Sequence, residues 1–351
     1  MSLITKVTAR VFGYPGVKGG GNPVTVFLWK ERSHPSVELR TSLAQSCEWE
    51  SVVAHLPLPL SLSRREEYKD GSGSDSSEED LQLYFYMPSG EEVSFCAHAA
   101  MGAVAAVTHE EPHSISSSTD IHKQVDFRIA DGTSQVAKVL PNNQIELELG
   151  SYHEESRVHE IDIQNLLDQI GLSTYGRVTS TGEEEQPPCV NSSVARSKTL
   201  LPVNTLETLH SATNPSNPLH FQKLCETINS TGIYLYCKTT PTPFTNNGTV
   251  EAYECRQFPK SSGYPEDPAT GIAAAALAYS LYRRRRRQEK DDGEELYPFW
   301  FEMIQGTAMG KRSLIQIGIR KGIRDHPSTI QCLGHVEIDS IELTTVTCGV
   351  E

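Results

Sequence analysis

Residues 263–282, GYPEDPATGIAAAALAYSLY, place two acidic side chains and a proline directly before a run of alanine and other apolar residues. A helix without a polar face must be buried, so the fold has to surround this segment with other elements. Glu266 or Asp267 stands where an N-cap belongs, and Pro268 suits the first helical turn. Both acids can cap the helix, or one can face a ligand, because a helix N-terminus that opens to a cleft binds anions.

A second segment of the chain has the same design. Residues 86–107, YMPSGEEVSFCAHAAMGAVAAV, and residues 257–278, QFPKSSGYPEDPATGIAAAALA, each run from a strand end through a proline and a glycine-containing turn into an alanine-rich helix. His98 stands four positions before the helix glycine in the first segment, as Asp267 does in the second. The two glycines are separated by about half the chain, a spacing typical of a duplicated lobe. The pattern predicts two similar lobes, each with a sheet around one buried helix, whose N-termini point to a shared cleft.

Strand-like patterns dominate the chain. Stretches rich in β-branched and aromatic residues alternate between apolar and polar positions and are separated by polar or Gly/Pro segments. These stretches are residues 4–12, 23–29, 81–88, 124–130, 144–152, 232–238, 248–258, 300–306, 313–319 and 335–343. Helical patterns, besides residues 263–282, are residues 36–47, 96–109, 163–171 and 218–229. The order of these elements indicates an α+β fold rather than alternating βα units.

The length of 351 residues exceeds the size at which a single core stops growing, which also predicts two lobes. We expect an N-terminal lobe at residues 1–125 and a C-terminal lobe at residues 126–325, with strands at about 326–351 returning to the first lobe. Residues 63–80 and 283–295 are poor in apolar side chains and are predicted to be surface insertions. The five arginines of the second insertion precede acidic residues, which indicates a solvated helix end rather than a nuclear signal or a polyanion patch.

Charge and cysteine content exclude several classes of protein. Lys and Arg number 31 against 45 Asp and Glu, a formal net charge of −14, and a surface this acidic repels nucleic acid. The eight cysteines lack zinc-ligand spacing in a chain too long to need disulfides, so we expect reduced thiols in a cytoplasmic protein. No apolar run is long enough for a membrane span, and the N-terminus lacks a secretory pattern. The sequence has no phosphate loop, nicotinamide fingerprint or metal cluster, so we expect no cofactor and no metal.

Five segments together resemble the signature of a known family. They are GGGNPVTVF (19–27), EWESVVA (48–54), GEEVSFCAHAAMGA (90–103), EDPATG (266–271) and IQGTAMGKRS (304–313). Their order and separations are similar to those of the phenazine-biosynthesis PhzF-like family, from about residue 5 to about residue 320. The resemblance implies a diaminopimelate-epimerase-like fold: two pseudo-symmetric lobes, each a curled mixed β-sheet wrapped around a central α-helix, with a cleft between them.

The resemblance also implies an activity. It is that of an isomerase that shifts a proton within a small cyclic or unsaturated carboxylic acid, with one glutamate as both general acid and general base. This glutamate falls on Glu50, with Glu48 as the weaker claimant, and the residues that position the substrate fall on His98 and Asp267. The local sequence alone favours simpler roles for these residues. It indicates an exposed strand residue at Glu50, a neutral capping residue at His98 and a helix cap at Asp267.

Substrate contacts are expected at Asn22, Ala97, Gly102, Pro268, Thr270, Gly271 and Ile272, with a carboxylate held by backbone N–H groups near residues 98–102 and 268–272. Three positions depart from the family pattern: Ala97 replaces a glycine, Ala100 a threonine and Ile272 a small serine. The change at Ile272 removes a hydroxyl and adds bulk, which argues against a phenazine precursor as the substrate.

Two other functions stay open. A binding or interaction protein that keeps the fold without turnover is favoured by Ile272, but the presence of Glu50, His98 and Asp267 together opposes it. A cofactor-independent racemase or epimerase would use two thiols, and Cys96 supplies one while the second helix offers Asp267 instead. We therefore expect Cys96 to be a buried small residue. The expected partner is a small acidic molecule, neither nucleic acid nor membrane, and a homodimer is the oligomeric state to test.

Overall fold

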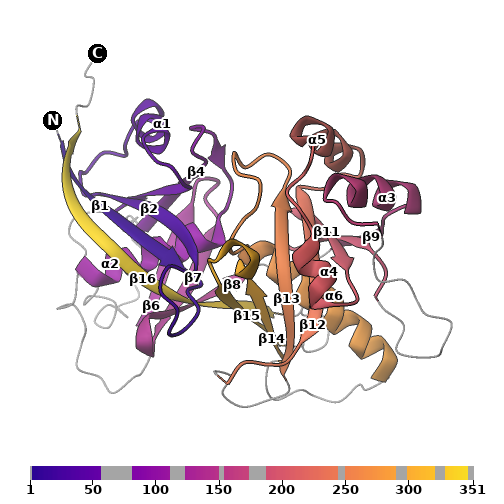
Figure 1. Cartoon of the computed structure of the whole chain (residues 1–351). Helices are drawn as coiled ribbons and strands as arrows, with labels where there is room; N and C mark the ends of the chain where they lie inside the picture. The colour runs from indigo at the N-terminus through magenta and orange to yellow at the C-terminus, as the bar shows by residue number, and fades with distance from the viewer. Residues whose placement is uncertain are drawn as a thin grey trace. The chain divides into compact units, whose positions relative to one another are not determined.

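The computed structural model describes residues 2–56, 81–110, 123–149, 154–173, 187–243, 250–289, 299–320 and 329–346, and Figure 1 shows their helices and strands. These residues form a mixed β-sheet structure with a small number of helices. The chain divides into two compact units. Unit 1 comprises Met1–Val11, Pro23–Leu147 and His335–Glu351, and unit 2 comprises Phe12–Asn22 and Glu148–Gly334. Each unit is therefore assembled from separate pieces of the chain.

Unit 1 is built on strands in the order β1-β2-β3-β4-β6-β7-β8, with β5 beside β4. These strands are β1 (Ser2–Val11), β2 (Asn22–Trp29), β3 (Ser51–His55), β4 (Leu81–Tyr86), β5 (Glu92–Val93), β6 (Lys123–Ile129), β7 (Ser134–Leu140) and β8 (Gln144–Leu149). The pairs β2–β3 and β4–β6 are parallel, whereas β3–β4, β6–β7 and β7–β8 are antiparallel. The second half of β16 (Thr329–Val346) pairs with β1 in antiparallel fashion, from Val336 opposite Val11 to Val346 opposite Ser2.

The helices described in unit 1 are α1 (Val37–Gln45) and α2 (Ala97–Glu110). Helix α2 packs against β1, β3, β4 and β7, and most of its side chains are buried, as its apolar sequence predicts. Gly102 allows the close approach of α2 to β2, because a Cβ built on it would lie 2.6 Å from Cγ1 of Val24. The central glycine of the first alanine-rich segment is therefore a packing residue.

Replacing Gly102 by alanine is expected to lower the free energy of unfolding by about 1 to 2 kcal/mol, because overpacking costs about 1 to 3 kcal/mol and alanine regains up to about 1 kcal/mol of helix propensity. Val24 is fully buried and β-branched, so it cannot turn away. Urea unfolding of Gly102→Ala, Val24→Ala and the double variant measures the coupling between the two sites. The double variant should lose less than the sum of the single losses, and simple additivity would contradict the contact.

Unit 2 contains strands in the order β16-β15-β14-β13-β12-β11-β10-β9. Besides residues 329–334 of β16, they are β9 (Glu154–Arg157), β10 (Val190–Ser193), β11 (Ser197–Pro202), β12 (Gly232–Thr239), β13 (Val250–Pro259), β14 (Phe299–Gln305) and β15 (Ser313–Arg320). The pairs β11–β12 and β13–β14 are parallel. The other neighbouring pairs of this series are antiparallel.

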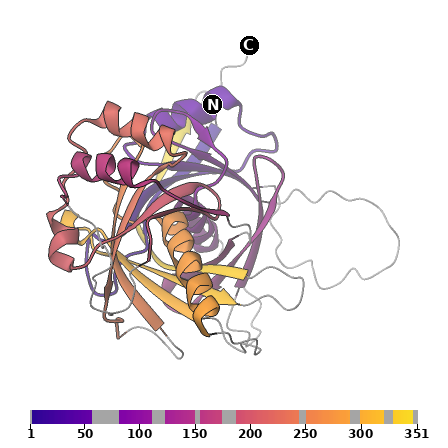
Figure 2. The same ribbon diagram turned by 90° about the vertical axis from the view of Figure 1, so that its right-hand side faces the viewer.

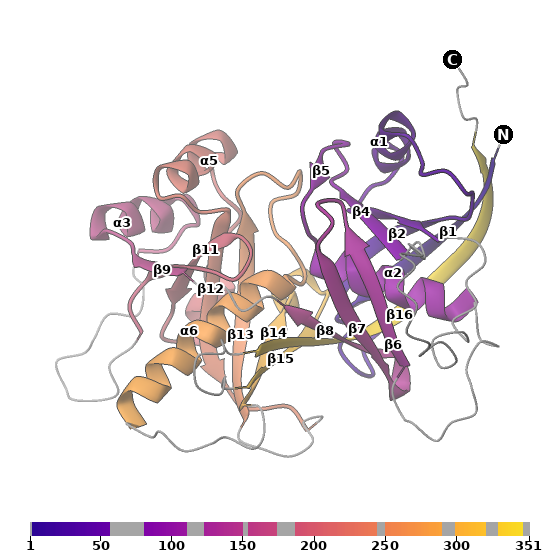
Figure 3. The same ribbon diagram turned by 180° about the vertical axis from the view of Figure 1, so that it is seen from behind.

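Helices cover both faces of the unit 2 strands. Helices α3 (Glu160–Gln169), α4 (Leu206–Ser211) and α5 (Pro218–Thr227) lie on the face turned to the viewer in Figure 1, and α6 (Gly271–Glu289) lies on the face seen in Figure 3. Ile233, Leu235 and Phe258 belong to the apolar cluster under α3, α4 and α5. On the other face, Ser192 Oγ donates to the Ala276 carbonyl of α6 at 3.2 Å. Figure 2 shows α6, in orange, along these strands. The buried position predicted for this alanine-rich helix is confirmed.

The five-arginine run is part of α6, which continues to Glu289. Arg284 pairs with Glu155 at 3.3 Å, and Arg285 pairs with Glu251 at 3.1 Å. The arginines therefore lie in the last turns of α6, at the helix end that the sequence indicated, and two of them are paired with acidic residues of β9 and β13. The rest of this predicted insertion and the other predicted insertion lie outside the described residues.

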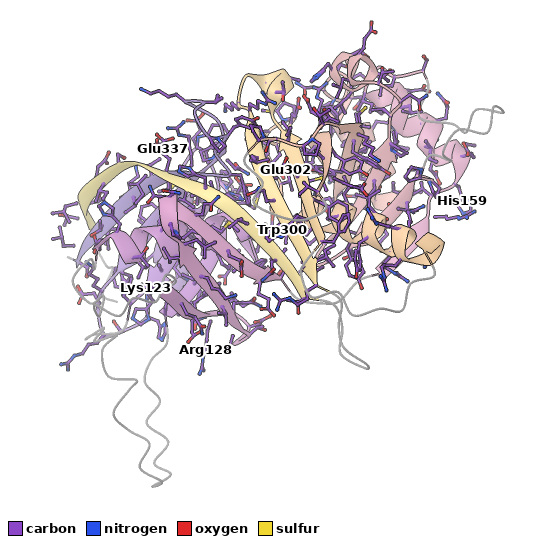
Figure 4. The ribbon with its side chains drawn as sticks, turned by 90° about the horizontal axis from the view of Figure 1, so that it is seen from below. Lys123, Arg128, His159, Trp300, Glu302 and Glu337 are labelled. Carbon is purple, nitrogen blue, oxygen red and sulfur yellow. The ribbon has the colours of Figure 1, made fainter. Side chains whose placement is uncertain are left out.

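Two side chains of β14 show how the strands of unit 2 are held in register (Figure 4). Trp300 lies over Gly318 of β15, where a Cβ would come within 2.9 Å of the indole ring. Glu302 is fully buried, and its carboxylate accepts the N–H of Thr242 at 2.6 Å and its hydroxyl at 2.7 Å. A steric match thus fits β14 against β15, and charge-assisted hydrogen bonds tie it to the segment that follows β12.

Every strand-like stretch predicted from the sequence overlaps an observed strand, whereas the short helix α4 and the strands β5, β7 and β9–β11 were not predicted. Unit 1 extends to Leu147, beyond the lobe boundary expected at residue 125. The reason is that β6 pairs with β4, β7 pairs with β6, and β8 pairs with β7. The chain rejoins unit 1 at His335, within β16. None of the described helices has both the length and the apolar character that a membrane span requires.

Candidate functional site

The two acidic residues before α6 do not cap it. The helix begins at Gly271, and the carbonyl of Thr270 accepts the N–H of Ala274 at 3.0 Å, so Thr270 is the capping residue. Pro268 therefore precedes the helix instead of lying in its first turn. The N-cap predicted at Glu266 or Asp267 is wrong, because each carboxylate has other partners in unit 2.

Glu266 is half of a buried ion pair. Arg256 Nε donates to Glu266 Oε1 at 2.9 Å, and Arg256 Nη2 donates to Oε2 at 2.7 Å. The remaining donor, Arg256 Nη1, binds backbone carbonyls at the end of α4, including that of Leu209 at 3.2 Å. A bidentate pair with its other donors satisfied is the geometry in which a buried charge is tolerated. Glu266 thus anchors the segment that leads to Asp267 and is not free for a ligand.

Asp267 is held by neighbours on both of its carboxylate oxygens. Oδ1 accepts Nδ2 of Asn22 at 2.9 Å and the N–H of Ala269 at 3.2 Å, and Oδ2 accepts the hydroxyl of Thr270 at 2.6 Å. Its own N–H donates to the carbonyl of Gln257 at 3.0 Å. The structure therefore brings together Asn22, Asp267 and Thr270 of the predicted site, and it fixes the Asp267 carboxylate in one orientation beside the N-terminus of α6.

Gln305 was not predicted, yet it lies at the centre of this group. Its Nε2 donates to the carbonyl of Asp267 at 2.6 Å, and its Oε1 accepts the N–H of Thr270 and the hydroxyl of Tyr234, each at 3.1 Å. Gln305 is 0% exposed, and burial raises the pKa of Tyr234, which keeps that hydroxyl a donor. The signal in the sequence was its place in the segment IQGTAMGKRS. Gln305 braces the turn from Asp267 to Thr270.

Replacing Gln305 by leucine is expected to lower the free energy of unfolding by about 2 to 3 kcal/mol, because buried donors and an acceptor lose their partner. Tyr234→Phe is the matched control. It removes a single hydroxyl and leaves Gln305 bonded to Thr270, so it should cost only about 1 kcal/mol. Urea unfolding of both variants measures the difference. Equal losses would show that the Gln305 amide does not hold the turn.

Lys198 is a second residue of unit 2 that was not predicted. It is buried, and its Nζ donates to the carbonyl of Thr231 at 3.2 Å. Burial, followed by the nearby Arg196, lowers the pKa of Lys198 to about 8, whereas the Asp267 carboxylate acts to raise it. At neutral pH the lysine is therefore still mostly a cation, and the charge of Asp267 favours that form.

Glu50 lies in unit 1, directly before β3. Its carbonyl accepts the N–H of Thr25 at 3.1 Å, which extends the parallel pairing of β2 and β3 by one bond. Glu50 is 6% exposed, and the adjoining Val52 and Val53 are fully buried, whereas Glu48 is exposed. Of the two glutamates considered, Glu50 is therefore the buried one, and the alternative of an exposed strand residue is wrong.

His98 is the second residue of α2 and is 7% exposed. The carbonyl of Cys96 accepts the N–H of Ala100 at 2.9 Å, so Cys96 caps the helix and His98 lies in its first turn. The Sγ of Cys96 lies 3.3 Å from Nδ1 of His98. Unit 1 thus presents an imidazole and a thiol at the N-terminus of its apolar helix.

The two glycines expected to contact a substrate face side chains of their own units. A Cβ on Gly102 would meet Val24, and a Cβ on Gly271 would lie 3.0 Å from Cζ of Phe12 and 3.4 Å from Sγ of Cys332. Ile272, the departure from the family pattern, is buried in the first turn of α6. These glycines let each helix approach its neighbours closely, and their role in substrate binding stays a prediction, as do those of Ala97 and Pro268.

A comparison with known protein families shows the family to which this chain belongs. A family model described as phenazine biosynthesis-like protein matches residues 17–336. The chain belongs to this family. A PhzF-family phenazine biosynthesis protein from Bacillus anthracis has a similar structure, with a TM-score of 0.71 at 17% sequence identity over 99% of this chain and 100% of that one. A predicted epimerase from Pseudomonas aeruginosa gives 0.65 at 17% identity over 98% and 100%.

The structure is also similar in fold to a solved epimerase. A hydroxyproline epimerase from Agrobacterium vitis, solved with bound trans-4-hydroxy-L-proline, matches with a TM-score of 0.51 at 11% identity over 98% of this chain and 91% of that one. At these identities the likeness is one of fold. A search of curated proteins by sequence finds no match. The family expected from the five sequence segments is confirmed, and the structure has the mixed β-sheet with few helices that this family shares.

Proposed function

We propose that this family member is an isomerase that shifts a proton within a small cyclic or unsaturated carboxylic acid. In this proposal Glu50 is the single general acid and base, and His98 and Asp267 position the substrate. The observation that carries it is the family match over residues 17–336, a range that includes all three residues. The proposed reaction neither gains nor loses electrons, so it requires no redox cofactor.

The surroundings of each residue support its role. A proton shuttle needs a carboxyl group away from bulk water, and Glu50 is buried on a backbone held by β2. Asp267 receives hydrogen bonds from Asn22 and Thr270, so its orientation toward a substrate amine or hydroxyl is set before binding. His98 in the first turn of α2 can donate a hydrogen bond to an acidic substrate.

The substrate carboxylate would be held by backbone N–H groups in the first turns of α2 and α6. On α6 the N–H groups of Ala269 and Thr270 donate to Asp267 and Gln305. On α6 we therefore propose that the N–H groups of Gly271 and Ile272, the first two residues of the helix, hold the substrate carboxylate.

We further propose that units 1 and 2 are the two pseudo-symmetric lobes, each a curled sheet around its own central helix. Each unit contains one buried alanine-rich helix, α2 or α6, whose glycine packs against side chains of the same unit. A lobe boundary near residue 147 is supported by the pairing of β6 with β4. A cytoplasmic location and a homodimeric state stay predictions.

Hydrogen exchange in D₂O tests the proposed function. A panel of cyclic and unsaturated carboxylic acids is incubated with the protein and followed by proton NMR, and trans-4-hydroxy-L-proline is included because one structural relative binds it. Isomerisation is expected for at least one acid, and a change of configuration alone would indicate an epimerase. Thermal stabilisation without exchange would indicate a binding protein, since a ligand at 100 times its dissociation constant adds about 2.7 kcal/mol to stability.

A further inference from the structure

Cys96 lies beside His98, and the proposed isomerase mechanism assigns a role to His98 but none to the Cys96 thiol. The Sγ of Cys96 lies 3.3 Å from Nδ1 of His98 and 3.9 Å from Nε2, so the thiol and the imidazole are within hydrogen-bond reach. Both residues are 7% exposed. A sulfur nucleophile next to a base is the arrangement by which proteins activate thiols.

The position of this pair at the start of α2 favours transfer of the proton from sulfur to nitrogen. Cys96 caps the helix through its carbonyl, which accepts the N–H of Ala100 at 2.9 Å. The N–H groups of a first helical turn carry partial positive charge and lack partners within the helix, so they stabilise a negative sulfur. A cation on His98 alone would be disfavoured there, but beside a thiolate it belongs to a pair with no net charge.

The other described cysteines have different surroundings. Burial raises the pKa of Cys189 and of Cys225, each to about 12. Burial also raises the pKa values of Cys237, Cys255 and Cys332. Cys47 is half-buried, and its thiol donates to the carbonyl of Leu43 at 3.3 Å. Thiols in apolar surroundings stay protonated and react slowly, which sets Cys96 apart.

We propose that Cys96 and His98 form a thiolate–imidazolium pair, which makes Cys96 the site at which small electrophiles and peroxides modify this protein. With iodoacetamide, the sulfur forms a bond to carbon as the carbon–iodine bond breaks, iodide leaves with the electron pair, and the proton stays on His98. With hydrogen peroxide, the sulfur attacks one oxygen and the O–O bond breaks. The His98 proton converts the departing hydroxide to water, so the sulfur is oxidised to a sulfenic acid and the peroxide is reduced.

One consequence rests on the proposed function. Because His98 is proposed to hold the acidic substrate, a group added to Cys96 would lie beside it and block that end of α2. Peroxide would then inactivate the isomerase reversibly, since a dithiol returns the sulfenic acid to the thiol.

The thiolate pair is tested without any substrate, by iodoacetamide labelling of the full chain from about pH 5 to about pH 9 with peptide mass spectrometry. At about pH 6.5, where an ordinary thiol is about 1% ionised, Cys96 should be labelled at least about tenfold faster than Cys47. His98→Gln keeps a polar side chain that cannot accept the proton, so its Cys96 labelling at this pH should fall about tenfold or more. The matched control Cys47→Ser should leave the labelling of Cys96 unchanged.

Equal labelling of Cys96 in the wild type and in His98→Gln would overturn the proposal, as would labelling that rises only above about pH 8.5, the ordinary thiol value. If circular dichroism shows that His98→Gln is unfolded, the pH profile of the wild type decides alone. The proposed function is tested by a separate experiment, the hydrogen exchange in D₂O. Fast labelling of Cys96 in a chain that exchanges no acid leaves the thiolate pair standing, whereas exchange with slow labelling refutes only the pair.

Discussion

Glu50→Gln is expected to lower the turnover of the acid identified by exchange by about 10²–10⁴-fold, the range that general acid/base catalysis contributes. The amide keeps nearly the same shape but can neither take up nor return the proton. Because the Glu50 backbone is held by the bond from Thr25, the fold and the affinity for the acid should change little. Rates of isomerisation and exchange by NMR, with kcat and KM determined separately, measure the effect.

Glu48→Gln is the matched control for this variant, since Glu48 carries the same functional group two residues away and is exposed. Its turnover should equal that of the wild type. In D₂O a single base returns part of the original hydrogen to the product, so some product should retain it. Undiminished turnover in Glu50→Gln would falsify the assignment and move the role to Glu48 or Cys96.

Glu266→Ala is expected to lower the free energy of unfolding by about 3 to 5 kcal/mol, because it leaves the guanidinium of Arg256 buried without its partner. The pair is bidentate, at 2.9 and 2.7 Å, and both residues are buried. Urea unfolding followed by circular dichroism measures the loss. Since Glu266 precedes Asp267, the variant should also weaken binding of the acid identified by exchange.

An exposed ion pair and a double variant serve as controls. Glu226→Ala removes the partner of Lys260 in a pair at 3.9 Å that is open to solvent, and it should cost no more than about 1 kcal/mol. Arg256→Met combined with Glu266→Leu removes both buried charges and should recover most of the stability lost in Glu266→Ala. A double variant as unstable as Glu266→Ala would show that packing, and not the unpaired charge, causes the loss.

The sequence predicted the elements whose residues interact with near neighbours in the chain. The alternating stretches became strands, and the two alanine-rich segments became buried helices, because a helix without a polar face has no stable position in water. The five ordered segments also identified the family, which the match over residues 17–336 confirms. The resemblance assigned a catalytic role to Glu50, while its local pattern alone indicated an exposed strand residue.

The tertiary structure decided what the acidic residues at the start of α6 do. Glu266 is paired with Arg256 of β13, and Asp267 is held by Asn22 and by the turn that Gln305 braces. Local sequence favours an N-cap at either acid, since capping needs only neighbouring N–H groups. Partners 245 residues apart, such as Asn22 and Asp267, meet only after the chain has folded. A buried carboxylate accepts hydrogen bonds from the strongest donors that lie near it in the folded chain. The sequence alone does not show which donors those are.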